Sequence, residues 1–123
     1  MRGTVAILAL GAAVVAASCA TAAVRCPGGD ITCERVRARI EVARGHAGEA
    51  EGGEVADARM EVTRIGSPAV PWLVRALDDE EPSVAAFAAR SLMEMGHTDD
   101  VERWCQGSTP NTDIFCGSGR RRH

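Results

Sequence analysis

The feature that most constrains the fold is an internal period of 30 residues within residues 54–96. Two pairs of an apolar residue followed by glycine, Ile65-Gly66 and Met95-Gly96, lie 30 positions apart. A period of this length is typical of architectures in which a small supersecondary unit repeats. Because one such unit cannot bury its apolar face alone, the repeat predicts that successive units stack against each other.

The segment 67–96 is predicted to form two helices joined by an acidic turn. Pro68 suits the first turn of a helix, where its missing N–H has no intrahelical partner. Apolar residues then follow at helical spacing, namely Val70, Leu73, Val74 and Leu77. The acidic run 78–81 interrupts this pattern, Pro82 suits the start of a second helix, and Gly96 is suited to end it. Each helix is apolar on one side, so the hairpin needs a neighbour to cover it.

This hairpin resembles a HEAT repeat of the short bacterial type, the kind also seen in phycobilin-lyase-like proteins. The resemblance covers residues 54–96 and is weak outside them. It rests on Ile65-Gly66-Ser67-Pro68-Ala69-Val70-Pro71-Trp72-Leu73-Val74, on Ala76-Leu77 and Asp78, and on Pro82-Ser83-Val84, Ala88-Ala89-Arg90 and Met95-Gly96. HEAT repeats form curved helical solenoids that mostly bind other proteins, so the resemblance implies this fold and this role, although a fold does not fix a function.

The predicted fold class is all-α, a short α-solenoid of about two HEAT-like hairpins plus a terminal helix. Residues 33–106 would form this HEAT-like domain, preceded by a linker over residues 23–32. Residues 107–123 are rich in Gly, Ser and Arg and are predicted to be a tail, either frayed or ordered by a disulfide. The predicted helices cover residues 33–44, 54–65, 68–77, 82–95 and 98–106.

Residues 1–22 are predicted to be an export signal. Arg2 gives a positive start, and the 13 residues from Val5 to Ala17 form an apolar stretch of the length found in secretory signals. The small residues before Cys19 resemble a bacterial lipobox, which implies cleavage before Cys19 and its lipidation. Cleavage before Ala23 and an uncleaved membrane anchor remain open. All three alternatives predict an extracytoplasmic protein, either a membrane-anchored lipoprotein or a secreted or periplasmic one.

The cysteines indicate two disulfides. If Cys19 is lipidated or removed, four cysteines remain, and an even number is typical of disulfides in an exported chain. In a stack of helices, Cys33 and Cys105 would lie about 16–20 Å apart, whereas a disulfide needs Cα atoms within about 7 Å. The local pairs Cys26–Cys33 and Cys105–Cys116 are therefore favoured, and each would hold a terminal segment over one end of the stack.

Composition and motifs give no indication of an enzyme, a metal site or a cofactor. The formal net charge is −3, whereas a general nucleic-acid-binding protein would show a basic stripe. HEAT-type deoxyhypusine hydroxylases bind iron through His-Glu pairs, but His46 and His97 are followed by Ala47 and Thr98. The cysteine spacing suits no common zinc motif, and the chain shows no nucleotide-binding loop or catalytic triad.

Five residues are candidates for binding another protein. The acidic turn contains Asp78, Asp79, Glu80 and Glu81, which could attract a basic partner. Trp72 lies beside the apolar stripe of its helix, so its ring is expected to be partly exposed and could anchor a partner. The alternatives are a solvated loop for the acidic turn and packing at the edge of the core for Trp72.

The function favoured by these observations is a non-enzymatic protein-interaction module of the cell envelope, with another protein as its partner and no nucleic acid. Lipidation of Cys19 would add the membrane as a second partner. The alternative is a structural or inhibitory envelope lipoprotein, for which tethering matters more than any groove. A more remote alternative, a lyase related to HEAT-repeat lyases, rests on the family resemblance alone.

Overall fold

The computed structural model describes residues 23–46 and 53–120. Within these residues the chain forms six α-helices and one short 3₁₀ turn, and no β-strand. The all-α fold expected from the sequence is therefore confirmed. The elements are α2 (Ile31–Gly45), α3 (Gly53–Ile65), η1 (Ser67–Ala69), α4 (Val70–Ala76), α5 (Pro82–Glu94), α6 (Thr98–Cys105) and α7 (Pro110–Arg120).

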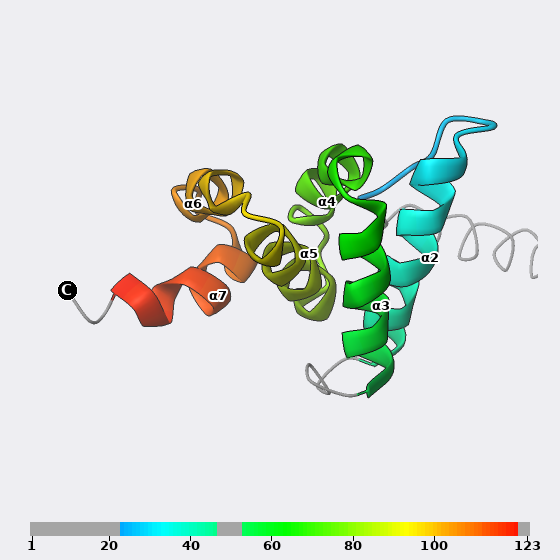
Figure 1. Ribbon diagram of the computed structural model, residues 1–123. Coiled ribbons are helices and arrows are strands. Elements are labelled where there is room, and N and C mark those ends of the chain that lie inside the picture. Colours follow the sequence, from blue (N-terminus) through cyan, green and yellow to red (C-terminus); the bar gives the residue numbers. More distant parts are fainter. Residues whose placement is uncertain (1–22, 47–52, 121–123) are drawn as a thin grey trace, which may run out of the picture.

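The helices follow one another as three successive pairs (Figure 1). The pair α2 and α3 lies at one end, α4 and α5 lie in the middle, and α6 and α7 lie at the other end. Helix α5 is central, because it packs against both helices of the first pair, against its own partner α4, and against both helices of the last pair. Helices that are close in sequence are thus also close in space.

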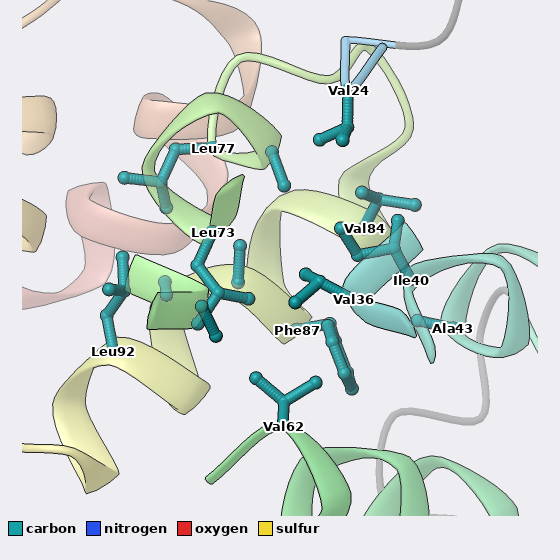
Figure 2. Close-up of a cluster of buried hydrophobic side chains, with 14 of the residues drawn as sticks. Val24, Val36, Ile40, Ala43, Val62, Leu73, Leu77, Val84, Phe87 and Leu92 are labelled. Carbon is teal, nitrogen blue, oxygen red and sulfur yellow. The ribbon is translucent and has the colours of Figure 1, made fainter. Parts of the chain in front are cut away.

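The hydrophobic core lies mainly between the first and second pairs. Figure 2 shows Phe87 of α5 among valines and an isoleucine of the first pair, while Leu73 and Leu92 fill the space between α4 and α5. Alanines of α4 and α5 are also fully buried, which lets the helices approach closely. The largest buried apolar side chains are Val36, Ile40, Val62, Leu73, Leu77, Val84, Phe87 and Leu92.

Local sequence signals set the ends of two helices. Asp30 caps α2, since its carboxylate accepts a hydrogen bond of 2.9 Å from the backbone N–H of Cys33. Gly96 ends α5 with φ of +84°, a conformation that favours glycine. The N–H of Gly96 bonds to the carbonyl of Met93, and that of His97 to the carbonyl of Leu92, which together form a Schellman motif.

The structure differs from the sequence prediction at three places. The helix predicted over residues 68–77 begins as the 3₁₀ turn η1 before α4, and Pro68 and Pro71 lack the N–H groups of a regular first turn. The predicted linker 23–32 is partly built into the domain, because Val24 is buried in the core. The predicted tail 107–123 contains helix α7, which packs on α5 and α6.

Candidate functional site

The acidic turn between α4 and α5 does not present four equivalent carboxylates. Asp78 and Glu80 are exposed and Glu81 is half-buried, but Asp79 is only 2 % exposed. Asp79 therefore has a structural role and is not available to a partner, contrary to the expectation from the sequence. The exposed acidic surface of this turn reduces to Asp78 and Glu80, with Glu81 at its edge.

The carboxylate of Asp79 is held by hydrogen bonds from two distant segments. Arg44, near the end of α2, makes a two-pronged contact with it, with distances of 3.0 Å from Nη1 to Oδ1 and 2.7 Å from Nη2 to Oδ2. The backbone N–H of Glu81 donates to Oδ1 at 3.0 Å, and that of Ala23 donates to Oδ2 at 3.3 Å. A buried carboxylate is tolerated only where its charge is paired and its oxygens accept hydrogen bonds. Both conditions are met here.

These contacts determine the protonation state of the pair. Burial by itself raises the pKa of Asp79, but the hydrogen bonds from Arg44, Glu81 and Ala23 outweigh it, and the pKa lies below the ordinary value. The pKa of Arg44 is raised, chiefly by its hydrogen bond to Asp79, against the opposing effect of desolvation and with a smaller contribution from Glu41. Asp79 and Arg44 are therefore both charged at neutral pH.

Helix α7 is attached to the same turn through Asn111. Its side-chain Nδ2 donates to the backbone carbonyl of Asp79 at 2.7 Å, and Asn111 is itself buried. The start of α7 is capped by Thr109 and Thr112, because the N–H of Thr112 bonds to the hydroxyl of Thr109 and the N–H of Thr109 to that of Thr112. The pair Thr109-Pro110, a cap followed by proline, was the sequence signal that could have predicted this helix.

A groove runs between the acidic turn and the start of α7. It has a volume of about 480 Å³ and is lined by Leu77, Asp78, Asp79, Glu80, Thr109, Pro110 and Asn111. Asp78 and Glu80 contribute exposed carboxylates to this groove, and Pro110 contributes an exposed apolar ring, whereas Leu77 is buried beneath it. A surface that combines negative charge with an exposed apolar ring is suited to a segment that combines a basic side chain with a small apolar one.

Trp72 is only partly exposed. Its ring is half-buried against the core, as the sequence led us to expect. The guanidinium carbon of Arg75 lies 5.0 Å from the centroid of this ring, which is the geometry of a cation–π contact. Arg75 therefore covers part of the surface that Trp72 would offer to a partner.

A second groove is lined by residues from the start of α2 and from α3. It has a volume of about 440 Å³, and its lining includes the apolar residues Ile31, Ala38 and Ile65 beside charged side chains such as Arg35 and Glu61. Ile31 is 74 % exposed.

Both disulfides favoured by the sequence are present. Cys26 is bonded to Cys33 with Cα atoms 5.5 Å apart, and Cys105 is bonded to Cys116 with Cα atoms 5.7 Å apart. The first ties the N-terminal segment to α2, and the second ties α7 to α6. Trp104 and Phe115 are the sequence neighbours of Cys105 and Cys116, and the centroids of their rings lie 5.8 Å apart. Two disulfides indicate an oxidising, extracytoplasmic environment.

Two histidines, His46 and His97, lie within the described residues, and each contacts neighbouring protein groups. Nδ1 of His46 is 2.8 Å from the carbonyl oxygen of Val42, and its Nε2 is 3.1 Å from a carboxylate oxygen of Glu54. Nδ1 of His97 lies 3.6 Å from a carboxylate oxygen of Asp100. Among residues 23–46 and 53–120, no three His, Cys, Asp or Glu side chains are grouped as metal ligands would be.

The segment that carries the predicted export signal and Cys19 lies outside the described residues. Among the helices that the structure describes, none is long and apolar enough to span a membrane.

Comparison with known proteins gives no match, whether to a family model, to a curated protein or to a solved structure. What the described residues show is a small set of six packed helices with two disulfides.

Proposed function

We propose that this chain is an extracytoplasmic, HEAT-like interaction module that binds another protein and has no catalytic activity of its own. The arrangement of α2 to α7 as three successive pairs supports a short solenoid. The hairpin of α4 and α5, with its proline-rich start and its glycine end, supports the HEAT-like assignment. The two disulfides support an address outside the cytoplasm.

The groove beside the acidic turn is the observation that carries this proposal. The exposed carboxylates of Asp78 and Glu80 line this groove together with the exposed ring of Pro110. This surface is fixed in position, since Asp79 and Asn111 bind the turn to α2 and α7 from within. A fixed surface loses little conformational entropy when a partner binds. The partner class that fits is a protein segment with a Lys or Arg next to a small apolar residue.

A capture experiment with charge-matched variants tests this proposal. The immobilised domain is exposed to envelope extract and bound proteins are quantified over a range of concentrations. The double variant Asp78→Asn with Glu80→Gln should lose a saturable partner, and added salt should weaken capture by the wild type. Asp57→Asn with Glu102→Gln removes the same charge from exposed positions on α3 and α6 and should retain the partner.

Thermal unfolding of each variant, followed by circular dichroism, checks that all of them are folded. Identical capture by the two double variants would show that the groove is not the binding surface, and salt-insensitive capture would exclude a partner held by these charges.

A further inference from the structure

The N-terminal segment is fixed in position from its first described residue. Val24 is only 3 % exposed and points into the core, as Figure 2 shows. Two residues later, the disulfide to Cys33 joins Cys26 to α2. The backbone nitrogen of Ala23 is thereby held 3.3 Å from Oδ2 of Asp79. The contacts of Val24 and Cys26, which closely follow Ala23 in the sequence, therefore fix the position of this nitrogen beside Asp79.

The surroundings of this nitrogen carry an excess of negative charge. Arg44 is the cation that contacts Asp79, but it is shared, since its Nε also lies 3.0 Å from a carboxylate oxygen of Glu41. One guanidinium therefore faces two carboxylates, which leaves a net charge of about −1 in this cluster at neutral pH. A second cation beside Asp79 would balance it. Oδ2 of Asp79 accepts hydrogen bonds from the cationic Arg44 and from the neutral N–H of Ala23. The nitrogen of Ala23 is therefore the place where a second positive charge could contact this oxygen.

The sequence places a small-residue cleavage pattern directly before Ala23. Ala20-Thr21-Ala22 has small side chains at the two positions that signal-peptide cleavage requires, with the apolar stretch upstream. Hydrolysis of the peptide bond between Ala22 and Ala23 adds one water molecule, breaks the C–N bond, and leaves a carboxylate on Ala22 and an ammonium group on Ala23. The reaction needs only water and an export-pathway peptidase specific for small residues.

We propose that Ala22–Ala23 is the processing site, and that the new α-ammonium group of Ala23 forms an ion pair with the buried carboxylate of Asp79. Processing then replaces a neutral hydrogen bond by a charge-assisted one, which is roughly twice as strong. The mature fold is stabilised only after the leader has been removed, because the uncleaved chain and a chain cleaved before Cys19 both keep a neutral amide at Ala23. Asp79 thus acts as the receptor for the mature N-terminus.

The composition of the chain makes this proposal testable with little ambiguity. The sequence contains no lysine, and all of its basic side chains other than histidine are arginines. An amine-selective acetylating reagent therefore modifies the α-amino group alone. Acetylation keeps an N–H at Ala23 and removes its charge, so it isolates the ion pair from the neutral hydrogen bond.

The experiment begins with the full-length chain, expressed in a secretion-competent bacterial host and recovered after export. Intact mass and N-terminal sequencing should show a chain that begins at Ala23. Acetylation in denaturant, followed by refolding with the disulfides intact, should lower the Tm by about 4–8 °C, the shift that the loss of one such interaction gives in a domain of this size. The same modification of the Asp79→Asn variant should leave its Tm unchanged.

A second measurement covers the case in which Asp79→Asn does not fold. The α-amine of the folded wild type should be acetylated several-fold more slowly than that of the unfolded chain, because the ion pair protects it. Equal rates, or an unchanged Tm after acetylation, would overturn the proposal. A lipidated chain that begins at Cys19, or a chain that still begins at Met1, would also overturn it.

Discussion

Replacing Asp79 by alanine should be among the most destabilising changes in this domain. The wild-type carboxylate accepts two hydrogen bonds from Arg44 and one each from the N–H groups of Glu81 and Ala23. Removing one partner of a buried ion pair typically costs about 3–5 kcal/mol. The side chain of Arg44 is 29 % exposed and keeps Glu41 as a partner, so it is not left fully stranded. We therefore expect a loss of about 2–4 kcal/mol, part of it from the two N–H groups left without an acceptor.

The assay is urea unfolding followed by far-UV circular dichroism, with both disulfides kept oxidised. Asp78→Ala is the matched control, because it removes the same group from the neighbouring position, where the side chain is exposed. The control should change the free energy of unfolding by no more than about 0.5 kcal/mol, as surface substitutions usually do. Equal effects of the two substitutions would refute the argument that Asp79 connects α2, the turn and the N-terminal segment.

The same pair gives a pH dependence of definite sign. The pKa of Asp79 is lowered in the folded state, so the folded protein binds the proton less tightly than the unfolded chain does. The contribution to stability is complete above the unfolded pKa of about 3.9 and is lost as the pH falls through the folded pKa. The stabilities of wild type and Asp79→Ala should therefore converge at pH values below about 4. A constant difference between them down to strongly acidic pH would contradict this.

Two further predictions concern the core and the C-terminal helix. Leu92→Ala should destabilise the domain by about 2–5 kcal/mol, because this side chain is fully buried. The control is Met93→Ala, at a neighbouring position that is 46 % exposed, and it should have little effect on stability. Replacing Cys105 and Cys116 together by serine should cost about 2–4 kcal/mol and increase hydrogen exchange in α7, whereas unchanged exchange there would show that Asn111 and Phe115 hold the helix without the disulfide.

Much of the local structure followed from the sequence because its causes are local. The apolar spacing that includes Leu73 and Leu77 predicted which face of its helix is buried, and both of these residues are buried. Gly96 marked the end of α5 because the left-handed conformation there favours glycine. The disulfide partners could be ranked because a stack of helices would place Cys33 and Cys105 farther apart than a disulfide allows, which favoured the two local pairs.

Helix α7 was missed because its composition argues against it. The segment from Pro110 to Arg120 contains two Gly together with Asn, Thr, Asp and Ser, which are poor helix formers, so propensity outweighed the capping signal at Thr109. The helix depends on contacts that no local window contains. Asn111 bonds to the carbonyl of Asp79, Phe115 packs on Trp104, and Cys116 is bonded to Cys105.

The sequence by itself determined that residues 78–81 form an acidic turn between two helices, and only the tertiary structure decided which of the four carboxylates is buried. By composition alone Asp78 and Asp79 are interchangeable. They differ because α2 brings Arg44, 35 positions away, to the inner side of the turn, where two backbone N–H groups also converge. A carboxylate can leave water only where such partners already meet, and that meeting is a property of the packed helices.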